Sequence, residues 1–138
     1  MPRKTDSNNP ADWIYLSELD LEGVRFLAER EVSYAMCRSK LAEVLEKVVK
    51  AELIRCGWFL EKTHDLQRLG KELRIRNPDL ADHVQPLIAS LAEVYFTERY
   101  PGFDLDDPNW PVLRDEIKRV NGVLEIVKER IRGNAKPS

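Results

Sequence analysis

The chain has 138 residues, which is enough for one domain with a core of its own. Hydrophobic residues make up 43% of it and charged residues 33%, a composition that excludes a disordered chain. The formal net charge of −2 gives no basic field, so charge offers no support for nucleic-acid binding, and DNA is not expected as a partner. No stretch resembles a signal peptide or a membrane span. We therefore expect a cytoplasmic protein without membrane contact.

The sequence predicts no metal site and no cofactor. Cys37 and Cys56 stand alone, without a CxxC partner or a histidine at metal-ligand spacing. We expect both thiols to be reduced and buried on a helix face, and a disulfide is the alternative. The chain also lacks an HExxH motif, a glycine-rich phosphate loop and a nucleophile elbow.

Apolar residues recur at helical spacing, and no stretch alternates like a strand. The spacing predicts a first long helix from Asp12 to about Arg30 and a second from about Val32 to Cys56. Gly57 stands where a left-handed residue ends the second helix. The short linker predicts an antiparallel hairpin. One face of the first helix carries an apolar stripe, in phase with Gly23, that we assign to the core: Trp13, Leu16, Leu19, Phe26 and Leu27.

The middle of the chain predicts a short helix. The apolar link Trp58-Phe59-Leu60 is expected to press into the core, and Thr63 is expected to cap the helix, with His64 and Asp65 as its first helical residues. The alternative is that His64 and Asp65 form half of a catalytic site.

Two longer helices are expected after it. Asn77-Pro78 begins one that runs toward Tyr100 with a kink at Pro86, and the last runs from about Pro111 to Arg132. The fold class is therefore all-α, an up-and-down bundle of four main helices plus a short one. The domain spans residues 12–132, and residues 1–11 and 133–138 are expected to be flexible.

Three sequence words stand in a distinctive order. EKVVKAEL (residues 46–53) precedes Gly57, then come KTHDLQRL (62–69) and YFTERYP (95–101). This order resembles the HEPN domain, named for higher eukaryote and prokaryote nucleotide-binding proteins, and in particular its small stand-alone prokaryotic members. The resemblance covers about residues 12–132. It implies a helical bundle that forms a homodimer and is often encoded next to a minimal nucleotidyltransferase, as a toxin–antitoxin or defence pair.

Some members of the family are metal-independent ribonucleases that carry an arginine and a histidine separated by four to six residues, and others are binding or regulatory modules. Here six residues separate Arg76 from His83. His83 can take a proton from a ribose 2′-hydroxyl near neutral pH, and Arg76 can hold the phosphate. The chain has 13 arginines, however, so roughly 0.5 arginine–histidine pairs at such a spacing are expected by chance alone.

A nucleotide site is the second kind of site that the resemblance implies. We expect it near His64, Asp65 and Arg99, shared across a dimer, with Tyr100 beside it and Lys47 facing a phosphate. Each residue also has a structural interpretation. Arg99-Tyr100-Pro101 can be a helix stop with a packed ring, and Lys47 a solvated side chain. In the same way Glu46 and Lys50, four residues apart, are expected to form a surface ion pair.

Two functions follow from these interpretations. The first is a dimeric partner in a two-component toxin–antitoxin or nucleotide-linked regulatory system with a minimal nucleotidyltransferase. The alternative is a metal-independent endoribonuclease that uses Arg76 and His83 on an RNA substrate.

Overall fold

The computed structural model describes residues 7–92, 94 and 107–135. Over these ranges the chain is all helical, with five helices and no strand. They are α1 (Pro10–Glu29), α2 (Tyr34–Arg55), α3 (Leu66–Arg76), α4 (Pro78–Leu91) and α6 (Trp110–Ala135). The predicted fold class is confirmed. Pro86 lies inside α4, and the expected continuation of that helix to Tyr100 lies outside the described residues.

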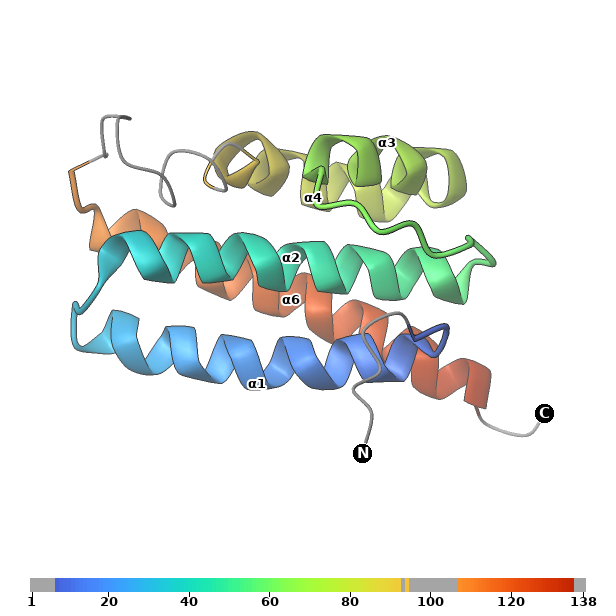
Figure 1. The fold of residues 1–138 in the computed structure, drawn as a ribbon, viewed down its shortest axis with the longest axis horizontal. Helices are drawn as coiled ribbons and strands as arrows, with labels where there is room; N and C mark the ends of the chain where they lie inside the picture. Colours follow the sequence, from blue (N-terminus) through green and yellow to red (C-terminus); the bar gives the residue numbers. More distant parts are fainter. Residues whose placement is uncertain (1–6, 93, 95–106, 136–138) are drawn as a thin grey trace.

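Helix α2 is the centre of the bundle (Figure 1). It forms the predicted antiparallel hairpin with α1, and α6 packs against both of them. The shorter helices α3 and α4 pair with each other and cover the other side of α2 and α6. Aliphatic side chains fill the space between these helices, and the largest fully buried ones are Leu41, Leu45, Leu53, Leu69, Leu73, Leu80, Leu87, Leu91, Leu113 and Leu124.

Local chemistry sets the ends of the hairpin helices. Asn9 caps α1 by accepting a hydrogen bond from the Ala11 amide, and Pro10 occupies the first turn. Gly57 adopts the left-handed conformation (φ 93°), and the Trp58 amide donates back to the Leu53 carbonyl. This pattern is a Schellman motif, which satisfies carbonyls that the helix end leaves open. The predicted role of Gly57 is therefore confirmed.

The prediction for the buried face of α1 is only partly correct, because Trp13 is buried and Leu27 packs against the core, whereas the other three apolar residues of the stripe are exposed. Leu16, Leu19 and Phe26 are 40%, 49% and 56% exposed. The neighbouring face is buried instead, through Trp13, Ile14, Ser17, Leu21, Val24 and Ala28. Both faces carry apolar residues at helical spacing, and periodicity alone does not say which of two such faces meets α2 and α6.

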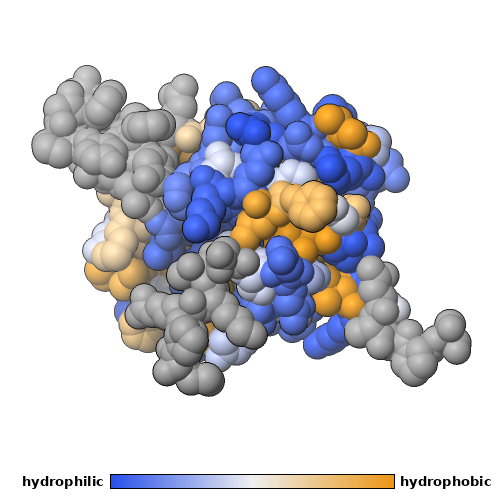
Figure 2. Space-filling view, turned by 45° about the vertical axis from the view of Figure 1, so that its right-hand side comes forward, coloured by the Kyte–Doolittle hydropathy of each residue, from blue (hydrophilic) through white to orange (hydrophobic). Residues whose placement is uncertain are grey.

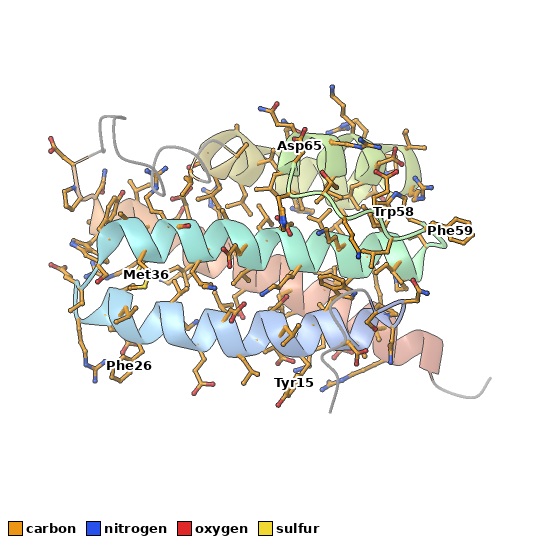
Figure 3. The ribbon with its side chains drawn as sticks, in the orientation of Figure 1. Tyr15, Phe26, Met36, Trp58, Phe59 and Asp65 are labelled. Atoms are coloured by element: carbon orange, nitrogen blue, oxygen red, sulfur yellow. The ribbon has the colours of Figure 1, made fainter. Side chains whose placement is uncertain are left out.

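Two further assignments to the core need correction. Cys37 is buried as expected, but Cys56 is exposed at the end of α2; both thiols are free. In the link after α2, Trp58 is buried whereas Phe59 is 89% exposed and points away from the bundle (Figure 3). Figure 2 turns this end of the molecule forward, and its visible surface is hydrophilic with apolar patches between the polar groups.

A fully buried carboxylate joins three parts of the fold at the same end. Glu52, in the last turn of α2, accepts hydrogen bonds from Arg55 Nε (2.6 Å), Asn77 Nδ2 (2.9 Å) and Arg130 Nη1. Burial raises the pKa of Glu52, but the hydrogen bonds from the two arginines and Asn77 outweigh it, so the pKa lies below its usual range. The charged carboxylate therefore ties α2 to α6 and to the α3–α4 junction.

Replacing Glu52 tests this tie. Glu52→Gln leaves two guanidinium groups without their shared counter-ion, and we expect the free energy of unfolding at pH 7 to fall by about 3 kcal/mol in urea denaturation. Because the folded-state pKa is depressed, the carboxylate stabilises the wild type above the ordinary glutamate pKa, and this contribution is lost as the pH falls through the folded value. The gap between wild type and variant should therefore narrow in acid. A constant gap from pH 7 to pH 3 would contradict the proposed charge state.

Candidate functional site

Two oppositely charged residues of α2 are buried one turn apart. Glu46 is 7% exposed and Lys50 is 3% exposed, and Lys50 Nζ lies 3.1 Å from Glu46 Oε2. The predicted ion pair is confirmed, but its predicted place on the surface is wrong. The Lys50 ammonium also lies 5.4 Å from the centre of the Trp13 ring, a cation–π contact with α1. Burying two charges costs free energy that their attraction only partly offsets, so this pair is not explained by stability alone.

The pair holds His64. Its Nδ1 atom lies 3.1 Å from both carboxylate oxygens of Glu46, while 66% of the His64 side chain remains exposed. An Nδ1–H that donates to a carboxylate orients the ring and directs Nε2 outward. Two motifs that are separate in the sequence, EKVVKAEL and KTHDLQRL, are therefore in contact in the fold, through Glu46, Lys50 and His64.

Asp65, rather than Thr63, caps α3. Asp65 Oδ1 accepts from the Arg68 amide at 3.1 Å, and the helix begins at Leu66. Thr63 Oγ1 accepts from the Asp65 amide at 3.2 Å, so Thr63 stands two residues before the capping position. Aspartate is the stronger capping residue of the two, and its charge suits the positive end of the helix dipole. His64 therefore lies before the helix, where its ring can reach α2.

A small pocket opens beside His64, between α2, the start of α3 and the end of α4. We call it the His64 pocket, and it is lined by Ser39, Ala42, Glu43, Glu46, His64, Leu66, Leu91 and Ala92. Its polar groups are two carboxylates, a hydroxyl and an imidazole, and its remaining walls are apolar. Carboxylates accept hydrogen bonds from hydroxyl and amino groups, whereas they repel phosphate. The pocket encloses only about 10 Å³, room for about one water molecule, so it can receive a single hydroxyl or amino group of a ligand that lies across its mouth.

The other residues predicted to bind a ligand are distributed differently. Lys47 forms an ion pair with Asp20 of α1 (2.6 Å), so its ammonium ties the hairpin together. Asp65 is occupied as the cap of α3. Arg99 and Tyr100 lie outside the described residues.

Arg76 and His83 have separate surroundings in the described part of the chain. Arg76 Nη1 lies 2.6 Å from Glu72 at the end of α3. His83 lines a groove between α4 and α6 whose other lining residues are Asp82, Pro86, Arg119, Gly122, Val123 and Ile126. The guanidinium in this groove thus belongs to Arg119, which the sequence spacing does not point to.

Neither thiol is suited to nucleophilic chemistry. Burial raises the pKa of Cys37, and partial shielding of the sulfur from water, together with the nearby Glu52 carboxylate, raises the pKa of the otherwise exposed Cys56. Both thiols are therefore protonated at neutral pH, whereas the thiolate is the nucleophilic form. Among the described residues, no group of three or more His, Cys, Asp or Glu side chains could hold a metal ion. In the same residues, no helix combines the length and the apolar character needed to cross a membrane.

The fold and the pocket define a helical-bundle protein with a carboxylate-held histidine at the mouth of a small polar pocket. Comparison with protein families gives the particular family: the HEPN domain matches residues 11–131 of the 138-residue chain. The chain belongs to the HEPN family. No curated protein and no solved structure matched it.

The sequence contains one indication of this site, a pair of charged residues at inward positions of α2. Glu46 and Lys50 fall in a helix most of whose other inward positions are apolar, among them Val44, Leu45 and Val48. A charged pair at helical spacing inside such a run is unusual because charged side chains are rarely buried unless paired. The contact between Lys50 and the Trp13 ring of α1 could not be found in this way, because no sequence pattern links the two residues.

Removing Glu46 and removing His64 should have very different effects on stability. Glu46→Ala leaves the Lys50 ammonium buried without a counter-ion, and we expect the free energy of unfolding to fall by about 3 kcal/mol. His64→Ala removes a mostly exposed ring and should cost less than about 1 kcal/mol. Urea denaturation at pH 7 measures both. The double variant Glu46→Met/Lys50→Met removes both charges and should recover most of the loss; a double variant as unstable as Glu46→Ala would refute the ion-pair explanation.

Proposed function

We propose that this protein is a dimeric HEPN partner module of a two-component toxin–antitoxin or nucleotide-linked regulatory system, acting with a minimal nucleotidyltransferase. We further propose that a nucleotide binds at the mouth of the His64 pocket. The observation that carries the proposal is the buried Glu46–Lys50 pair that holds an exposed histidine at the mouth of the pocket.

The geometry of the pocket supports a nucleotide by its distribution of polar groups. Glu46 is fixed by Lys50, and Glu43 by Lys40 at 2.8 Å, so both carboxylates are held in place before a ligand arrives. Ordering these groups in advance lowers the free energy that binding must spend on ordering them. A ribose or base lies across the mouth of the pocket with one polar group directed into it, and the phosphates extend past His64 toward solvent. Membership of the HEPN family is what supports a minimal nucleotidyltransferase as the proposed partner.

The homodimer is part of the same proposal. Large apolar side chains are exposed along α1 and at the start of α2, among them Tyr15, Leu19, Phe26 and Met36. Leu19 and Met36 line one hollow between the two helices, and exposed apolar side chains that gather in this way often mark an interaction face.

The second candidate function is a metal-independent endoribonuclease. The groove between α4 and α6 favours it, because His83 and Arg119 line one surface there. A histidine beside a guanidinium can accept a proton while the phosphate is held. In this candidate Arg76, predicted from its spacing to His83, acts from the end of α3.

Nucleotide binding tests the first candidate. ATP, adenosine and inorganic phosphate are titrated separately into the purified protein by isothermal calorimetry. We expect ATP and adenosine to bind and phosphate not to bind, because carboxylates line the pocket. His64→Ala should weaken ATP binding about tenfold or more, and Arg99→Ala extends the test to the predicted residue outside the described part. Gln67→Ala, which changes an exposed side chain in the first turn of α3, is the control. Equal affinities in wild type and His64→Ala would sink the pocket assignment.

Cleavage of RNA decides the second candidate. Mixed single-stranded RNA is incubated with the protein in EDTA, and products are resolved on a denaturing gel. The partner-module proposal expects no cleavage. If cleavage occurs and is lost in His83→Ala, the protein is a ribonuclease. A comparison of Arg76→Ala with Arg119→Ala then shows which guanidinium acts, since loss of transition-state charge stabilisation costs about 100-fold in rate.

A further inference from the structure

Six residues of α1 lie on one line along its outer side. Asp12, Leu16, Leu19, Gly23, Phe26 and Arg30 follow one another at alternating steps of four and three residues, and we call this line the α1 seam. Its three apolar side chains are 40%, 49% and 56% exposed. Figure 3 shows Phe26 pointing away from the bundle, with Tyr15 beside the seam also directed outward. An alternation of four and three is the spacing by which one helix packs lengthwise against another.

Gly23, in the middle of the seam, has no steric role within the chain. A Cβ atom added there would meet nothing within 4 Å. Glycine weakens a helix interior relative to alanine, and its usual compensation is a close approach by another backbone or side chain. A hollow of about 220 Å³ opens beside it, lined mainly by apolar residues that include Leu19, Leu27 and Met36. The seam therefore carries both protruding side chains and a place to receive one.

We propose that the α1 seam binds the α1 seam of a second copy of this chain, with the two helices antiparallel. This rests on the homodimer of the proposed function and names its interface. In this register Leu19 of each copy enters the hollow at Gly23 of the other, and Leu16 packs against Phe26. A two-fold symmetric contact is self-complementary, so one helix must supply both members of every pair. The α1 seam does so.

The charges at the two ends of the seam select this partner and this direction. Asp12 lies at one end and Arg30 at the other, and the antiparallel register places Asp12 of each copy against Arg30 of its partner. A parallel register would place like charges together. Within the chain Asp12 accepts a hydrogen bond from Ser7 Oγ, and the Arg30 guanidinium lies 3.7 Å from the centre of the Phe26 ring. Arg30 is exposed, so its outer side can meet a carboxylate of the second copy.

The apolar part is tested by a substitution that leaves the folded chain alone. Leu19→Glu changes a half-exposed side chain and should raise the dimer dissociation constant at least about 100-fold, because it places a charge in the interface. Sedimentation velocity over a concentration series measures this, with circular dichroism to confirm folding. Ile75→Glu, at an apolar side chain of α3 that is 75% exposed, is the matched control and should leave the dissociation constant unchanged.

The register is tested by exchanging charges. Asp12→Lys and Arg30→Glu each place two like-charged pairs in the dimer and should each weaken it about tenfold. An equimolar mixture of the two variants restores both attractive pairs, so heterodimers should form with nearly the wild-type dissociation constant.

Each outcome decides between the seam and the dimer itself. A wild-type dimer that is unaffected by Leu19→Glu overturns the seam and leaves the homodimer standing. A dimer that Leu19→Glu dissociates, but whose charge variants do not recover on mixing, overturns the antiparallel register. A wild-type chain that is monomeric at every concentration overturns both, and a nucleotidyltransferase partner that then binds wild type but not Leu19→Glu becomes the occupant of the face. Nucleotide binding at His64 is measured separately, so its failure is not confused with failure of the seam.

Discussion

The arrangement of the bundle depends on one buried charge, the Glu52 carboxylate. It is fully enclosed, yet it stays ionised because Arg55, Arg130 and Asn77 all donate to it. These donors come from α2 itself, from α6 and from the junction of α3 and α4. Asn77 also caps α4 through its Oδ1 atom. An apolar contact tolerates sliding, whereas a carboxylate with three directed hydrogen bonds fixes the helices in one register.

The same central helix supplies the candidate site. Four charged residues of α2 are buried, Arg38, Glu46, Lys50 and Glu52, and each meets a group from another element. Arg38 donates to the Ser90 carbonyl of α4, and Glu46 meets His64 from the loop before α3. Buried charges that contact separate elements make α2 both the core of the fold and the wall of the pocket. The residues of α2 must both pack the core and line the pocket, so the helix carries charged residues among its buried apolar ones.

The outer face of α1 illustrates a different relation between pattern and packing. In the proposed dimer its apolar line serves a second interface rather than the core. Helix α1 has one apolar face turned to α2 and α6 and a second, adjacent face turned to solvent. In the parts of the chain that the structure describes, only the first of these faces is covered, by α2 and α6. The remaining face is satisfied in the proposed dimer.

The sequence by itself determined the helices, several of their ends and the family, because these depend on local spacing and on residues close in the chain. Gly57 ends α2 by its left-handed conformation, Asn77 and Pro78 begin α4 by capping, and the three HEPN words stand in linear order. Only the tertiary structure decided which face of α1 is buried, that the Glu46–Lys50 pair is enclosed, and that His83 shares a groove with Arg119 rather than with Arg76. Each of these depends on the rotation of a helix about its axis and on which neighbour covers it. Contacts between distant segments set that rotation, and no local pattern records it.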